Sequence, residues 1–326
     1  MRLTSRRAAR ALVWDADAYV ANKSSFQAQF AASYLDRGDP TLRERLCEAR
    51  ALLDVGSGDG SFTSVMASLM PTTSRVVGVD PSSAMVESAR AASRARKVTG
   101  GAALAFENCD VASIAEWENE GYVPFKLNGF DLATSFMALH WCTEARIPAT
   151  LRAIRSALDN RGDAWLIASF HGERSMSSLF AAIYATIDAT AHGASAASWD
   201  DAATLVASER WRGRFPNGRA DFVPITMLPT VTWRRNLADA GFDVVERGRI
   251  SSRTVTTEYP DAAATAARLS AAFGPMFPTL PATSDREAFF EDVAHNAVRA
   301  ASDSSCDPRP VVVVSRVVDV AVPVRR

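Results

Sequence analysis

The sequence predicts an α/β fold in which helices cover both faces of a mostly parallel seven-stranded sheet. Two observations predict this class. Short apolar runs recur along the chain, several ending in an acidic or glycine-rich turn, and helical patterns separate them. An alternation of this kind is typical of a parallel sheet built from successive strand–helix units. We expect the last strand to be antiparallel and two long insertions to form a helical cap.

The predicted strands follow from local pattern. The first apolar run ends at Asp54-Val55 and breaks into Gly56-Ser57-Gly58-Asp59-Gly60, after which apolar residues recur at helical spacing. A strand, a tight glycine turn and a helix in this order open a nucleotide-binding unit of the Rossmann-like type. In chain order, the predicted strands are residues 51–55, 75–79, 103–108, 130–135, 163–169, 242–250 and 311–322.

The remaining segments do not fit the strand–helix alternation. Residues 1–50 are predicted to be N-terminal helices that contribute to a lid, because Phe26, Phe30 and Tyr34 recur at helical spacing. The predicted core comprises residues 51–172, 231–255 and 308–326. Insertions 173–230 and 256–307 are too long for ordinary connections. We interpret them as a cap over the carboxyl ends of the strands, and helices packed elsewhere are the alternative.

Composition restricts the function further. The 326 residues carry 36 basic and 37 acidic side chains without a dense basic stripe, so we expect no nucleic-acid partner. Four scattered cysteines favour reduced thiols and a cytoplasmic protein, and four histidines without ligand spacing predict no metal. No apolar run is long enough to predict membrane insertion. The basic N-terminus is interpreted as a solvated tail, and the oligomeric state stays open.

The charge of the glycine-rich loop indicates which cofactor it binds. Asp54 and Asp59 would repel the pyrophosphate of a dinucleotide, and the third glycine comes one residue early for the dinucleotide fingerprint. S-adenosylmethionine lacks phosphate and carries a sulfonium and an ammonium, so the electrostatics favour it. Taken alone, the glycine pattern also fits an ordinary turn.

Two further acids follow the next strands. Asp80 lies 24 residues after Gly56, close to the spacing at which a carboxylate accepts both ribose hydroxyls. The alternative for Asp80 is a helix cap, since Pro81 is expected to open a helix. After the third strand, Asp110 could accept from the adenine amine, with the Val111 amide facing a ring nitrogen.

These motifs, together with Phe130-Asp131-Leu132-Ala133-Thr134-Ser135, resemble class I S-adenosylmethionine-dependent methyltransferases over residues 51–170. The segment Ser135-Phe136-Met137-Ala138-Leu139-His140-Trp141, with Tyr19-x-x-Asn22-x-Ser24-Ser25-Phe26-Gln27, is similar to juvenile hormone acid methyltransferases and, more distantly, trans-aconitate methyltransferases. Both groups act on small carboxylic acids. The resemblance implies S-adenosylmethionine as cofactor and places Gln27 and Trp141 against the acceptor carboxylate. The expected cofactor contacts are Asp54, Gly56, Ser57, Gly58, Gly60, Asp80, Pro81, Met85, Asp110, Val111, Ser135 and Phe136.

The expected reaction is methyl transfer to a small-molecule carboxylic acid. A carboxylate is ionised at neutral pH and needs hydrogen-bond donors rather than a base, which the Gln27 amide and the Trp141 indole can supply. His140 could instead act as a base toward a hydroxyl, thiol or amine, or could merely pack beside the cofactor. A non-catalytic cofactor-binding protein is a third interpretation.

Several of these residues also have purely structural interpretations. Trp141 could be a core aromatic residue and Gln27 a helix-face residue, and core packing would explain Met85 and Phe136 as well. His171, just past the fifth strand, is expected at the surface or at a lid hinge. The apolar residues of the second insertion hint at a lipophilic acid as acceptor: Phe273, Met276, Phe277, Phe289 and Phe290.

Overall fold

The computed structural model describes residues 34–35, 40–95, 101–113, 129–160, 163–191, 210–222, 225–259, 261–300 and 311–325. They form one seven-stranded sheet in the order β3-β2-β1-β4-β5-β7-β6. β7 is antiparallel to β5 and β6, and β1 to β5 are parallel, as predicted. The strands are β1 (Ala51–Val55), β2 (Arg75–Asp80), β3 (Ala103–Asn108), β4 (Leu132–Phe136), β5 (Trp165–His171), β6 (Arg249–Tyr259) and β7 (Val311–Pro323).

Helices cover both faces of the sheet because neighbouring strand residues point to opposite sides. In β1, Leu52 packs with the face that holds α3 (Pro40–Glu48) and α4 (Ser61–Leu69). Leu53 packs with the other face, which holds α7 (Ile147–Ala157) and α10 (Thr230–Asp239). The remaining core helix, α5 (Ser83–Ala95), lies beside β2 and β3. The predicted two-sided arrangement is therefore confirmed.

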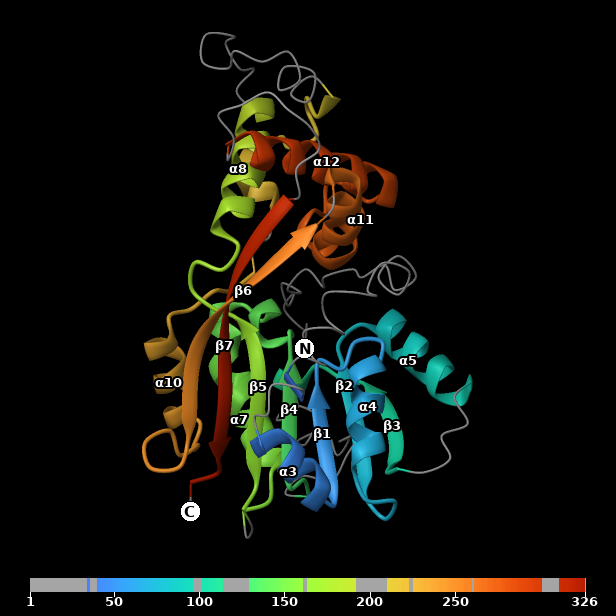
Figure 1. Cartoon of the computed structure of the whole chain (residues 1–326), viewed down its shortest axis with the longest axis vertical. Helices are drawn as coiled ribbons and strands as arrows, with labels where there is room; N and C mark the ends of the chain where they lie inside the picture. The colour runs from blue at the N-terminus through green and yellow to red at the C-terminus, as the bar shows by residue number, and fades with distance from the viewer. Residues whose placement is uncertain are drawn as a thin grey trace, which may run out of the picture.

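A long antiparallel ribbon connects the sheet to a second group of helices. β5 pairs with β7 over 317–323, whereas β6 pairs with β7 over the whole of 311–321. The outer part of β6 and β7 therefore extends past β5 and reaches α8 (Ser177–Ala191), α11 (Ala262–Phe273) and α12 (Thr283–Ala300), as Figure 1 shows. These three helices and the segments packed with them are called the cap. None of the helices in the described ranges has the length and hydropathy of a membrane span.

The sixth strand was predicted over residues 242–250, but the structure places it later in the chain. Phe242 makes an isolated bridge to Val324, and the chain then turns, so that the strand spans Arg249–Tyr259. The turn forms because Asp243 Oδ1 accepts the backbone N–H groups of Val245 and Glu246. Since β6 continues to Tyr259, the second insertion leaves the sheet later than residue 256. The other predicted domain limits stay predictions.

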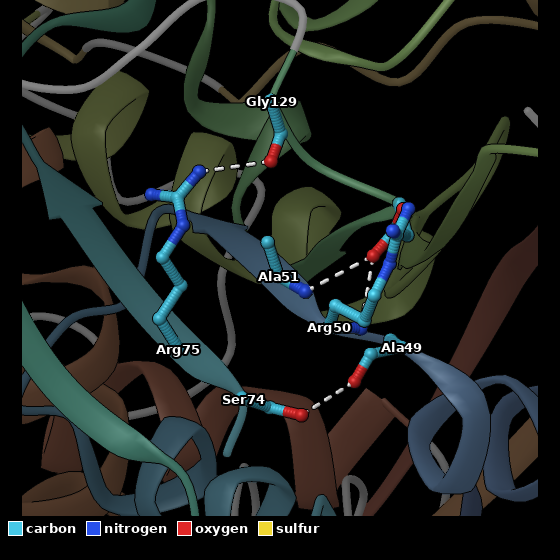
Figure 2. A network of polar contacts seen from close by, with 7 residues as sticks. Ala49, Arg50, Ala51, Ser74, Arg75 and Gly129 are labelled. Atoms are coloured by element: carbon cyan, nitrogen blue, oxygen red, sulfur yellow. Dashed lines mark hydrogen bonds and ion pairs between the residues drawn. The ribbon is translucent and has the colours of Figure 1, made fainter. Parts of the chain in front are cut away.

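Polar side chains fix the starts of the central strands, at the edge opposite the glycine-rich loop. The Asp131 carboxylate accepts the backbone N–H groups of Arg50 and Ala51 at 2.8 and 3.2 Å and pairs with the Arg50 guanidinium. Nearby, Arg75 donates to the Gly129 carbonyl and Ser74 donates to the Ala49 carbonyl (Figure 2). This network ties β1, β2 and the start of β4 together at their amino ends.

Candidate active site

The glycine-rich loop adopts a conformation that requires glycine. Gly56, Gly58 and Gly60 have φ of 75°, 54° and 71°, a region that side chains with a Cβ rarely adopt. A Cβ on Gly56 would lie 2.2 Å from the Cβ of Ala138, whereas a Cβ on Gly58 would meet nothing within 4 Å. Gly58 therefore faces open space where a ligand can approach the backbone.

Asp80 joins this loop to the start of α5. Its Oδ2 accepts from the Gly58 N–H at 3.0 Å and its Oδ1 accepts from the Ser82 N–H at 2.8 Å. Each carboxylate oxygen has a second lone pair, so Asp80 can serve the helix start and still accept ribose hydroxyls. Burial raises the pKa of Asp80 to about 6. The helix itself begins at Ser83, so Pro81 precedes it.

Asp54 is buried under the loop with both of its oxygens engaged. Thr63 Oγ1 donates to Oδ2 at 2.5 Å and Thr134 Oγ1 donates to Oδ1 at 2.8 Å, which links β1 to α4 and β4. Burial, the largest effect, raises the pKa of Asp54 to about 6. Sequence reasoning missed both threonines, because only the fold brings their hydroxyls to this carboxylate. A direct contact between Asp54 and the cofactor stays a prediction.

Asp110 has a cationic partner that the sequence did not reveal. Arg146 Nη2 lies 2.7 Å from Asp110 Oδ2, and the Ala112 N–H donates to Oδ1 at 3.1 Å. Arg146 lies just before α7 and belongs to no motif. The expected acceptance of the adenine amine by Asp110 stays a prediction, and it would have to share the carboxylate with Arg146.

The other expected cofactor residues are engaged in packing. Ser135 is fully buried and donates from Oγ to the Val55 carbonyl at 2.9 Å. Phe136 packs edge-on against Phe62, with ring centroids 4.9 Å apart. Met85 and Val111 are also buried. These contacts hold the ends of the strands in place and leave the roles of these residues toward the cofactor as predictions.

The segment after β4 meets the cap. Met137 has φ of 53°, a costly conformation for a residue with a side chain, and the short 3₁₀ helix Leu139–Trp141 follows it. Trp141 is partly buried against the cap cluster, and its ring centroid lies 6.2 Å from that of Phe273. Trp141 thus lies between the sheet edge and the cap, where an acceptor pocket is expected. Gln27 lies outside the described residues.

His140 and His171 form a buried pair. Their exposed fractions are 2% and 1%, so the expectation that His171 lies at the surface is wrong. The ring centroids are 4.8 Å apart. Burial, reinforced by His171, lowers the pKa of His140 well below its ordinary value, and burial lowers the pKa of His171 to about 3. Both imidazoles are therefore neutral at physiological pH.

Part of the chain matches a known protein family. The family model described as "Methyltransferase domain" matches residues 52–162, which span β1 to the segment before β5 and contain the loop, Asp80, Asp110 and His140. These residues are a methyltransferase domain. The chain therefore contains a methyltransferase domain, which supports the enzyme class that the sequence predicted. The narrower resemblance to the juvenile hormone acid and trans-aconitate group is not established by this match.

Solved structures with a similar fold have low sequence identity to this chain. YcgJ from Bacillus subtilis is 13% identical, with 88% of this chain and 99% of that chain covered, at a TM-score of 0.49. Magnesium protoporphyrin IX methyltransferase from Synechocystis PCC 6803, with bound S-adenosylhomocysteine, is 15% identical, with 95% and 86% covered, at 0.43. A search among curated proteins finds no matching sequence. The fold assignment therefore rests on the observed strand order.

The glycine-rich loop of the methyltransferase domain fits a nucleoside that carries hydroxyls and positive charge. Ser57 Oγ is buried and has no hydrogen-bond partner among the described residues, although it lies inside the loop. Buried hydroxyls are nearly always paired, so this atom is suited to a group that a ligand brings. Together with the open space at Gly58 and the carboxylate of Asp80, it matches the hydroxyl and cationic groups of S-adenosylmethionine.

Proposed function

We propose that this methyltransferase transfers a methyl group to the carboxylate of a small-molecule acid. The single observation that carries the proposal is the placement of Trp141 and His140. Trp141 packs against the cap, His140 is buried beside it, and burial keeps the imidazole neutral. Neutral N–H donors can hold one carboxylate oxygen without quenching the nucleophilicity of the other as a tight cationic pair would.

The proposed step needs little from the protein beyond orientation. When bound, S-adenosylmethionine supplies an electrophilic methyl carbon, and the acceptor oxygen bonds to that carbon as the carbon–sulfur bond breaks. The acceptor is already ionised, so no proton has to be removed. Residues at the strand ends would align the two reactants, and alignment of this kind contributes roughly 7–11 kcal/mol to such reactions.

The cap supports an apolar acid as acceptor. Its buried residues form an apolar cluster against which Trp141 packs, and the cluster contains several aromatic side chains. An acceptor with a carboxylate at Trp141 and a hydrocarbon body toward the cap would match this gradient of polarity.

The direct test is turnover of S-adenosylmethionine with a panel of acids. Fatty, terpenoid and polycarboxylic acids should be methylated, with the product identified as a methyl ester by mass spectrometry. Matched alcohols, phenols, thiols and amines of the same carbon skeletons serve as controls. Methylation of the controls alone would refute the proposal and favour His140 as a base. Tight binding of S-adenosylhomocysteine without any turnover would favour a non-catalytic protein.

Trp141→Phe separates hydrogen bonding from packing. Phenylalanine keeps an aromatic ring against the cap but lacks the indole N–H. If Trp141 holds the acceptor carboxylate, this variant should lose about tenfold in kcat/KM for the acid while the Kd of S-adenosylhomocysteine changes less than about twofold. An unchanged kcat/KM would show that Trp141 acts as a packing residue only.

A further inference from the structure

Two elements converge on the histidine pair at the edge of the sheet. His140 belongs to the 3₁₀ helix after β4, and His171 is the last residue of β5. The His140 carbonyl accepts from the Thr226 N–H at 2.7 Å, and Thr226 Oγ1 donates to the Cys142 carbonyl at 2.6 Å. The backbone around His140 is therefore held on one side by the segment before α10 and on the other by β5.

The hydrogen bond between the histidines defines the tautomer of His140. The His171 backbone N–H donates to His140 Nδ1 at 3.5 Å. A backbone N–H can only donate, so Nδ1 must present its lone pair to it. In a neutral imidazole the proton is then on Nε2. Nδ1 therefore accepts from β5, and Nε2, the nitrogen left for other partners, is a donor.

Ser175 fixes the second imidazole in a similar way. Its Oγ accepts from the Arg316 N–H at 3.0 Å and lies 2.9 Å from His171 Nδ1. Ser175 is fully buried, so its hydroxyl hydrogen needs an acceptor, and His171 Nδ1 is within hydrogen-bond distance. If Ser175 donates to Nδ1, the proton of His171 is on Nε2.

The turn that carries Ser175 is strained. Arg174 and Met176, its two neighbours, have φ of 59° and 51°, although neither is glycine. Such conformations cost on the order of 1–3 kcal/mol each and persist where the surrounding structure demands them. Hydrogen bonds from Gly172 N–H to the Arg316 carbonyl and from Met176 N–H to the Val314 carbonyl hold this turn against β7. This conformation of the turn places the Ser175 hydroxyl within hydrogen-bond distance of His171.

We propose that Ser175 and His171 are positioning residues that hold His140 as a neutral donor, with its proton on Nε2, at the acceptor pocket. His140 then hydrogen-bonds an anionic acceptor and does not take a proton from it. The inference rests on the proposed function in one respect, because a fixed donor serves catalysis only if the acceptor is an anion. The tautomers themselves do not depend on the acceptor.

Long-range ¹H–¹⁵N correlation spectra of the histidine side chains test the tautomers directly. In the full-length protein at neutral pH, His140 and His171 should both show the neutral pattern with the proton on Nε2. Single His→Gln substitutions at 140 and 171 assign the signals. A proton on Nδ1 of either ring, or a charged His140, would overturn the proposal. This readout requires neither the acceptor nor turnover.

Ser175→Ala tests the positioning role, and Ser74→Ala is its matched control. Both variants delete a buried hydroxyl that makes a hydrogen bond, but Ser74 lies at the amino edge of the sheet (Figure 2). Ser175→Ala should alter the His171 and His140 signals and lower kcat/KM for the acceptor about tenfold, with the Kd of S-adenosylhomocysteine unchanged. Ser74→Ala should leave the signals and kcat/KM unchanged.

The outcomes separate the inference from the proposed function. Unaltered histidine signals and unaltered kcat/KM in Ser175→Ala would refute the positioning role. If that variant fails to fold, the tautomer of His171 in the wild-type protein still decides whether Ser175 donates to it. If no acid of the panel is methylated but both histidines show the expected tautomers, carboxylate methylation is rejected while the hydrogen-bonded arrangement of His140 and His171 is confirmed.

Discussion

At the scale of single residues, the two carboxylates of the cofactor loop are the most informative groups. Asp54 and Asp80 both have pKa values raised to about 6 by burial. Asp54 accepts one threonine hydroxyl on each oxygen and is buried, whereas Asp80 accepts one backbone N–H on each oxygen and is only partly buried. Of the two carboxylates, Asp80 is therefore the one that hydroxyls of a ligand can reach.

Cofactor affinity should depend on pH through Asp80. The ionised carboxylate binds ribose hydroxyls and attracts the cationic donor, so affinity should be constant above about pH 7 and fall as the carboxylate gains a proton near pH 6. At about pH 5 the affinity should be roughly tenfold lower. Calorimetry with S-adenosylhomocysteine measures this directly, and Asp80→Asn should be weak and independent of pH. A wild-type Kd that is constant from about pH 5 to 7.5 would contradict the assignment.

The same two groups predict an opposite trend in the stability of the free protein. An acid whose pKa is raised in the folded state binds its proton more tightly there than in the unfolded chain. The contribution of these groups to the free energy of unfolding should therefore be largest at about pH 4 and below, and should decline as pH rises through about 6. Urea unfolding of the wild-type protein and of Asp54→Asn across this range checks the sign, since the substitution should flatten the decline.

At the scale of elements, the glycine-rich loop separates two roles of glycine. Gly58→Ala places a methyl group in open space at φ of 54°, so it should cost only about 1–2 kcal/mol of stability yet weaken cofactor binding. Gly56→Ala adds a clash with Ala138 and should cost several kcal/mol, on the order of 2–4. Adding Ala138→Gly to Gly56→Ala should remove the clash and restore the stability lost to it, but the strain of the positive φ at residue 56 should remain. Urea unfolding and calorimetry distinguish these outcomes.

The network at the amino edge should affect stability without affecting binding. Asp131→Ala leaves two backbone N–H groups and a guanidinium without their acceptor, which should cost about 1–3 kcal/mol. The network lies at the opposite end of the strands from the loop, so the Kd of S-adenosylhomocysteine should stay within about twofold. Asp239→Ala, at an exposed position on α10, is the control and should change stability by less than about 0.5 kcal/mol.

At the scale of the whole molecule, the sheet and the cap have separate hydrophobic cores. Phe170 is buried in the core between the sheet, α7 and α10, where its ring lies 4.2 Å from that of Trp233. Phe289 is buried in the cap core, packed against Phe277 and Phe215. The outer part of β6 and β7 is the ribbon that joins the two (Figure 1).

Truncating one phenylalanine in each core should have different functional consequences. Phe289→Ala and Phe170→Ala should each cost about 3–5 kcal/mol. The first should loosen the cap, so acceptor turnover falls while S-adenosylhomocysteine still binds. The second should weaken the methyltransferase domain, so binding and turnover fall together. Calorimetric unfolding and binding measurements on both variants check this, and equal loss of cofactor binding in the two would show that the cores are not independent.

Much of the architecture was predictable because it is encoded locally. The first strand was predicted to the residue, since an apolar run must end where Gly56 turns the chain, and the glycines of the loop have the positive φ that their spacing indicated. The sixth strand was misplaced because Phe242 and Val244 are apolar and buried, as strand residues often are. They lie in a turn, however, and not in a continuous β-ladder. Gln27 and part of the first insertion lie outside the described residues.

The sequence by itself determined the strand–helix alternation, the cofactor class and the order of the acids, because these depend on neighbours a few residues apart. Only the tertiary structure decided how each polar group is used. In the folded chain, Asp54 accepts hydrogen bonds from two threonines, Asp110 pairs with Arg146, and His171 is buried beside His140. Those partners are far apart along the chain, and their contacts arise only when the strands align at one edge of the sheet.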